Sequence, residues 1–207
     1  MTIVIILVVI VVLIIFICVL VKVVKKHNQH EKLIKTNETL EEKYKKLKLK
    51  IQIIPEKNRG SNLHELPEFS NVWKYLQKCV KNYSRSLADV EGKGRCIYCN
   101  QDYRIGLIEC HEEWEWDIDI HVQKLKRVVP ICPFCHNVVH FGHDDERFKR
   151  LAYSWLKSIN YFNNDESVAY REYIFGIKRK LYDPIDFKLD KTSILPVEKW
   201  ASKYERL

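Results

Sequence analysis

Four cysteines in two C-x-x-C pairs are the clearest chemical feature of this sequence. The pairs are Cys96-Ile-Tyr-Cys99 and Cys132-Pro-Phe-Cys135. A two-residue spacer turns both thiolates of a pair to the same side, so the two pairs can supply the four ligands of a tetrahedral Zn²⁺. The chain has 7 cysteines, and an odd number that includes two such pairs fits metal binding better than a disulfide framework. The sequence therefore predicts a structural zinc site, with four buried free thiols as the alternative.

Two histidines after the second cysteine pair indicate a second metal. His136 and His140 are four residues apart, which places both imidazoles on one face of a helix. Before the pair come Cys110 and His111, on a segment that we expect to be a strand, and a second strand is expected at 128–131. The alternative is that these histidines are ordinary core or hydrogen-bonded side chains.

This order of elements resembles the HNH, or ββα-metal, nuclease family. In that family two C-x-x-C elements often bracket two strands and a helix. The resemblance is closest to a bacterial and phage subgroup with the strings E-C-H-E-x-W, H-x-Q-x-L and C-P-x-C-H-x-x-x-H-x-G. These strings match residues 109–114, 121–125 and 132–142 here, and the likeness extends from about Ile54 to Leu195.

The resemblance implies a role for each matched residue. His111 would be the general base that activates water, and His136 and His140 would hold a divalent ion (Mg²⁺, Mn²⁺ or Zn²⁺) against the scissile phosphate. Cys110 takes the place of the Asp or His that usually precedes the base and also binds the metal. The expected function is metal-dependent hydrolysis of phosphodiester bonds in nucleic acid.

Two positions depart from the family pattern. Arg127 stands where the family has the central Asn that holds the base histidine. A thiolate at Cys110 would favour Zn²⁺ over Mg²⁺ or Mn²⁺. Lys124, Lys126 and Arg127 could neutralise a nucleic-acid backbone, whereas the acidic residues within 109–119 would repel it. The second hypothesis is therefore a catalytically inactive zinc-binding interaction module, possibly of viral or phage type, that binds a protein partner.

An apolar segment opens the chain. Residues 3–21 contain no charged side chain, and a helix of this length spans about 28 Å, close to the thickness of a bilayer core. Basic residues follow it within 22–26 and none precede it, which predicts a single-pass membrane protein with its C-terminal part in the cytosol. A cleaved signal peptide is the alternative, although the segment lacks a basic start and a small-x-small cleavage site.

A basic stalk follows the predicted anchor. Residues 22–60 hold 12 Lys and Arg against 5 Asp and Glu, which leaves 23 against 22 for residues 61–207, so most of the net charge of +8 lies next to the membrane. A heptad pattern predicts a helix that ends at Pro55 and either forms a homo-oligomer through residues 33–54 or remains a solvated amphipathic helix. The residues of this pattern are Leu33, Asn37, Leu40, Tyr44, Leu47, Ile51 and Ile54.

The sequence thus predicts three parts and an α+β fold class. Residues 1–24 form the transmembrane anchor, 25–60 the helical stalk with a linker around Gly60, and 61–207 the HNH-like zinc-binding domain. We expect a small ββα-metal core on the four-cysteine site with flanking helices. One of these should begin with Ser70 as its N-cap, and two more should follow the histidines, the second starting near Asn164.

Overall fold

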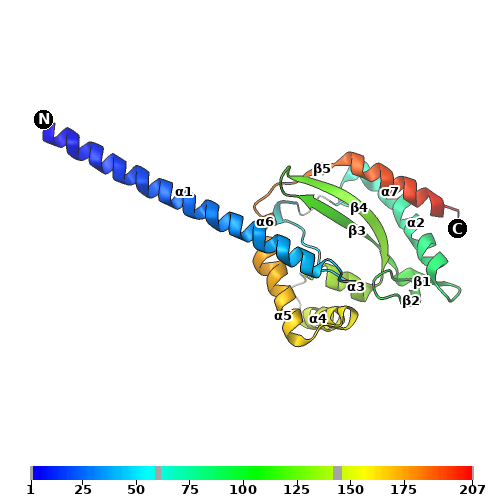
Figure 1. Ribbon diagram of the computed structural model, residues 1–207. Helices are drawn as coiled ribbons and strands as arrows, with labels where there is room; N and C mark the ends of the chain where they lie inside the picture. The colour runs from blue at the N-terminus through cyan, green and yellow to red at the C-terminus, as the bar shows by residue number, and fades with distance from the viewer. Residues whose placement is uncertain (1, 59–61, 142–145, 207) are drawn as a thin grey trace. The chain divides into compact units, whose positions relative to one another are not determined.

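A computed structural model of the chain describes residues 2–58, 62–141 and 146–206, without the side chains of residues 2–11, 56 and 146. The chain divides into two compact units, Met1–Lys45 and Lys46–Leu207. The first unit is one continuous helix, α1, Thr2–Tyr44 (Figure 1). Within the described part of the chain, no helix has the length and apolar character that a membrane crossing requires. Because the side chains of residues 3–11 lie outside that part, the membrane anchor stays a prediction.

The predicted stalk helix ends earlier than the heptad pattern indicates. Helix α1 stops at Tyr44 rather than at Pro55, so Leu47, Ile51 and Ile54 lie outside it. Residues 49–53 belong to no helix or strand, and Leu49, Ile51 and Ile53 are buried in alternation. A burial period of two differs from the heptad spacing, and Ile51 is the residue that the two patterns share. The expected linker at Gly60 and Ser61 lies outside the described residues.

The second unit contains the predicted α+β arrangement. Strands β3 (Glu109–Asp117) and β4 (Val122–Ile131) pair antiparallel, and β5 (Lys188–Asp190) joins β4 in parallel. Helix α3, Pro133–Val139, follows β4 directly and completes the ββα order. A separate two-stranded sheet of β1 (Lys93–Arg95) and β2 (Asp102–Arg104) carries the first cysteine pair in its turn.

Two helices cover one face of the larger sheet. Helices α2 (Ser70–Leu87) and α7 (Ile194–Ala201) pack against β3 and β4 (Figure 1). Ser70 is the first residue of α2 and not its cap: its N–H bonds to the carbonyl of Pro67 in the preceding 3₁₀ turn, which replaces a side-chain cap. The core of this layer consists of Leu63, Leu76, Cys79, Val80, Trp114, Leu125, Val128, Ile194, Val197 and Ala201.

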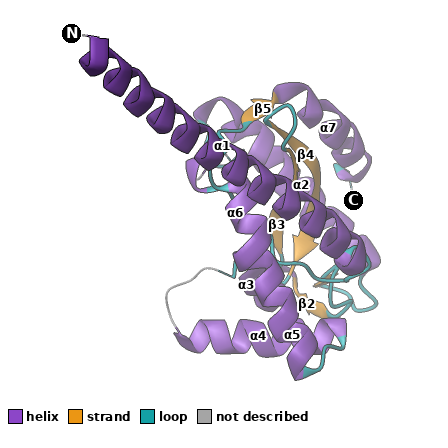
Figure 2. Ribbon diagram, turned by 60° about the vertical axis from the view of Figure 1, so that its left-hand side comes forward, coloured by secondary structure: helices purple, strands orange, loops and turns teal. Residues whose placement is uncertain are grey.

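The remaining helices lie around α3. Helix α4 (Glu146–Asn160) packs against α3, and α5 (Asn164–Glu172) begins with a capping box made by Asn163 and Glu166 (Figure 2). A π-helical turn, Tyr173–Lys178, joins α5 to α6, Arg179–Tyr182. Short 3₁₀ helices occupy Glu56–Asn58, Pro67–Phe69, Ile105–Leu107, Lys191–Ser193 and Ser202–Tyr204.

Candidate metal centres

The four cysteines of the two C-x-x-C pairs come together, as predicted. Their sulfur atoms all lie within 4.8 Å of one another, and the sulfurs of Cys99 and Cys132 are 3.9 Å apart. Cys96, Cys132 and Cys135 are fully buried. Four thiolates in this arrangement fit a tetrahedral Zn²⁺. In the part of the chain that the structure describes, Cys79 and Cys110 lie outside this cluster.

Local backbone geometry explains why each pair converges. In the β1–β2 turn, Asn100 adopts a positive φ of 58° and donates its N–H to the carbonyl of Cys96 at 2.9 Å, which closes the first C-x-x-C loop. In the second pair Cys132 is the N-cap of α3, and its sulfur accepts the N–H of Cys135 at 3.5 Å. Pro133 at the first helical position fits this cap, because that position needs no N–H donor.

The electrostatics of the four-cysteine cluster favour a bound cation. Hydrogen bonds from neighbouring thiols lower the pKa of Cys132 to about 7, with Cys135 as the main partner, and they lower the pKa of Cys99. The pKa values of Cys96 and Cys135 are raised, chiefly through their hydrogen bonds to Cys132. Thiols this close cannot all ionise unless a positive charge joins them, and a divalent metal supplies that charge.

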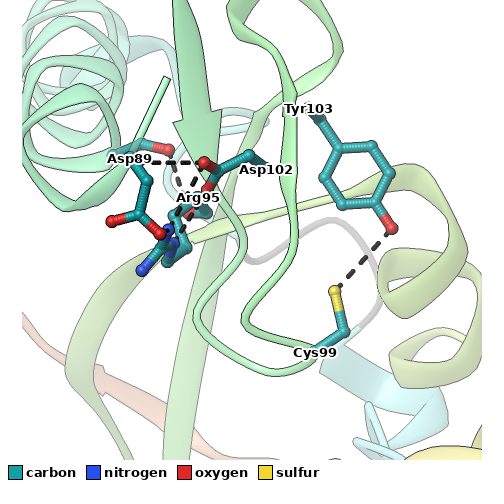
Figure 3. A network of polar contacts seen from close by, with 6 residues as sticks. Asp89, Arg95, Cys99, Asp102 and Tyr103 are labelled. Atoms are coloured by element: carbon teal, nitrogen blue, oxygen red, sulfur yellow. Dashed lines mark hydrogen bonds and ion pairs between the residues drawn. The ribbon is translucent and has the colours of Figure 1, made fainter. Parts of the chain in front are cut away.

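Polar contacts hold the hairpin that carries the first pair. The Arg95 guanidinium bonds to Asp102 at 2.8 Å and to Asp89, and the backbone N–H of Asp89 bonds to Asp102 at 2.9 Å (Figure 3). Figure 3 also shows the Tyr103 hydroxyl directed at the Cys99 sulfur, 3.8 Å away. The network fixes the loop from both sides and places the Cys96–Cys99 pair opposite α3.

Three histidines form a second cluster, separate from the cysteines. His111 comes from β3, and His136 and His140 lie one turn apart on and just after α3. The ring centroid of His111 is 5.1 Å from that of His136 and 4.9 Å from that of His140, and His136 and His140 are 4.7 Å apart. One nitrogen from each imidazole lies within 4.8 Å of the others, an arrangement that could hold a metal ion.

His111 and His136 also bond to acceptor side chains outside the cluster. His111 Nε2 is 2.9 Å from the side-chain oxygen of Gln52, and His136 Nδ1 bonds to the Glu109 carboxylate. Burial lowers the pKa of His111 to about 2, with smaller contributions from His140 and His136. A neutral imidazole keeps one lone pair, which either a metal or a water proton can use.

The structure does not bring Cys110 to the histidines. Adjacent residues of a strand point to opposite faces, and Cys110 packs against the hydrophobic core beneath α2 and α7 while His111 points toward α3. Burial raises the pKa of the Cys110 thiol. Arg127 does not fill the space between the imidazoles either, since its guanidinium binds both carboxylate oxygens of Glu113 at 2.8 Å.

Gln52 is the site residue that the sequence did not reveal. It belongs to no motif, and the heptad pattern assigned its segment to a helix. Glu109 was visible as one of several acidic residues near the histidines, but its partner was not. Comparison with protein-family models, with curated proteins and with solved structures gives no match.

Proposed function

We propose that this chain is a membrane-anchored, HNH-like, metal-dependent nuclease that hydrolyses phosphodiester bonds. The observation that supports the proposal most is the convergence of His111, His136 and His140 at a place distinct from the four cysteines. A cysteine cluster alone fits a structural role, whereas a metal on histidine ligands with a coordination position left for water is typical of a catalytic site. The strand–strand–helix order that carries them is the one that the resemblance implies.

The proposed roles take account of the hydrogen bonds that His111 and His136 make. His136 and His140 would hold the metal, since the Nδ1 bond of His136 to Glu109 leaves its Nε2 lone pair for an ion. A metal bound there would polarise the phosphate and stabilise the leaving oxygen. Imidazole ligands suit Zn²⁺ and other transition metals better than Mg²⁺. His111, neutral and buried, would take the proton from the attacking water.

Nucleic acid would approach a surface of mixed charge. Of the three basic residues expected to meet a backbone, Arg127 is paired with Glu113, and Lys124 lies 3.9 Å from Asp117. Lys126 is exposed on β4. Weak backbone attraction of this kind predicts low affinity for nucleic acid that falls further as salt rises.

A catalytically inactive zinc-binding interaction module displayed at a membrane is the second candidate. The core position of Cys110 favours it, because one ligand of the family's metal site is then missing. The pairing of Arg127 with Glu113 also favours it, since no side chain at 127 supports His111. In this case the chain would bind a protein partner through its C-terminal unit, and α1 would display it, singly or as a homo-oligomer.

A nuclease assay on the full chain in detergent separates the two candidates. Linear DNA, circular DNA and RNA are incubated with Mg²⁺, Mn²⁺ or Zn²⁺ and either the wild type, His111→Ala or His121→Ala. His121 is exposed, so its variant controls for the loss of any imidazole. We expect His111→Ala to lower cleavage by about 10²–10⁴-fold with the cysteine-bound zinc retained, and His121→Ala to cleave normally. Absence of cleavage by the wild type with every metal would favour the interaction module.

A further inference from the structure

We propose that Gln52 is a positioning residue for His111: its side-chain carbonyl accepts a hydrogen bond from His111 Nε2–H and thereby leaves the lone pair on Nδ1. The inference deepens the proposed function and rests on it for the role of His111 as the group that moves a proton. Gln52 lies far from His111 in sequence, before the first cysteine pair. It would act through His111 and not on substrate.

The contact has the geometry of a sound hydrogen bond. Gln52 Oε1 lies 2.9 Å from His111 Nε2, which is a usual N–H···O distance. An amide oxygen only accepts, so the ring nitrogen facing it must carry the hydrogen. His111 is 3% exposed, so water cannot readily replace Gln52, and a buried ring N–H without an acceptor would be destabilising.

The backbone around Gln52 is fixed by contacts on both sides. Its own N–H bonds to the carbonyl of Val139 at 2.9 Å, at the end of the helix that carries His136. The neighbouring N–H of Ile51 bonds to the buried Tyr170 hydroxyl at 3.0 Å. The residues on either side of Gln52, Ile51 and Ile53, are both buried. These hydrogen bonds restrain the segment and hold Gln52 beside the histidines.

Glu109 gives His136 the same kind of support. Its carboxylate bonds to His136 Nδ1, so His111 and His136 each have one nitrogen bonded to an acceptor side chain. On these two rings the nitrogens that remain for a metal or water are Nδ1 of His111 and Nε2 of His136. Outer hydrogen bonds of this type set the tautomer and the ring orientation, and their loss typically costs about 10–100-fold in affinity or activity.

The opposite amide orientation makes a different prediction. If the Gln52 NH₂ group faced the ring, it would donate to a lone pair on Nε2, and the hydrogen of His111 would sit on Nδ1. Gln52→Glu distinguishes the two, because a carboxylate accepts and cannot donate. An accepting Gln52 can be replaced by Glu with the tautomer unchanged, whereas a donating Gln52 cannot.

The test is the tautomer of His111, read from imidazole ¹⁵N shifts and two-bond ¹⁵N–¹H couplings of the full chain labelled at histidine, with His111→Ala to assign the signal. We expect an Nε2–H tautomer in the wild type and in Gln52→Glu. Gln52→Met, nearly isosteric and apolar, should give a mixture or the Nδ1–H form. Gln77→Met, the same change on α2, is the matched control and should match the wild type.

The rate of cleavage, measured with whichever metal ion supports it, provides a second test. Gln52→Met should lower kcat by about 10–100-fold with KM nearly unchanged, and Gln52→Glu should restore most of the rate. An Nδ1–H tautomer in the wild type overturns the inference, even if Gln52→Met fails to fold, and so does an unchanged tautomer in a folded Gln52→Met. A Gln52-dependent tautomer in a chain that cleaves nothing would uphold the positioning role and reject the nuclease.

Discussion

Replacing one cysteine of the four-cysteine cluster tests the zinc site most directly, and Cys132→Ser has a matched control in Cys79→Ser. Both side chains are fully buried, so the cost of burying a hydroxyl, about 1–3 kcal/mol, is similar in the two variants. Serine is also a good N-cap, so the start of α3, where Cys132 caps Cys135, should survive. The difference between the variants then reports the lost metal ligand.

The size of that difference can be worked out. Structural zinc sites bind with about 10–16 kcal/mol, and sharing this among four thiolates gives about 3 kcal/mol for each. A loss of this size weakens zinc binding by roughly 100-fold, because each 1.4 kcal/mol is a factor of ten. The β1–β2 sheet has strands of 3 residues each, too short to persist alone, so hydrogen exchange should rise within residues 88–107.

The assay is a titration of the zinc-loaded chain with a chelator, followed by metal content and thermal unfolding. Cobalt substitution separates the two clusters, because only thiolate ligands give an intense sulfur-to-cobalt charge-transfer absorption. Cys132→Ser should weaken that absorption and release zinc at lower chelator concentration, whereas Cys79→Ser should retain the wild-type midpoint. Equal zinc content and equal midpoints in the two variants would refute the assignment of Cys132 as a ligand.

Three further predictions concern the segment before the domain, a buried carboxyl and the membrane topology. Tyr170→Phe should lower the free energy of unfolding in urea by about 1–3 kcal/mol, because the buried N–H of Ile51 loses its acceptor at 3.0 Å; Tyr161→Phe, at an exposed ring, should change it little, and equal effects would contradict the role of Tyr170. Burial raises the pKa of Glu112 above its unfolded value, so its contribution to stability is present at low pH and is lost as pH rises through the folded pKa. Glu112→Gln should therefore gain stability relative to wild type as pH rises from about 4.3, and a constant difference between pH 4 and 8 in chemical unfolding would argue against this. A glycosylation acceptor fused to the C-terminus should stay unmodified, since the basic residues within 22–26 favour the cytosolic side; efficient modification would reverse the orientation, and a mature chain that starts after about residue 24 would indicate a cleaved signal.

Short-range spacing in the sequence was enough to predict the pairs of candidate ligands, Cys96 with Cys99, Cys132 with Cys135 and His136 with His140. The C-x-x-C pairs work through local turns, so each pair presents two sulfurs together once its loop closes. His136 and His140 share a helix face for the same reason. The strand–strand–helix order and the α+β class also follow from local patterns, since β3, β4 and α3 are consecutive in the chain. Nothing in these features depends on a distant partner.

Tertiary structure decided which residues surround the histidines. Strand alternation separates Cys110 from His111, but only the packing of α2 and α7 on one face of the sheet determines that Cys110 points into the core. The sequence alone allowed Arg127 to contact His111, whereas in the structure its guanidinium binds Glu113 instead.

The segment before the domain shows the limit of sequence patterns most clearly. Leu47, Ile51 and Ile54 fit a heptad, yet the chain leaves the helix at Tyr44. Within residues 49–53, backbone N–H groups bond to Asn160, Tyr170 and Val139 instead of to a helical turn, and all three partners lie far along the sequence. The spacing of apolar residues predicts only that their side chains will be partly or fully buried. The groups they are buried against determine the backbone conformation, and here that choice places Gln52 beside His111.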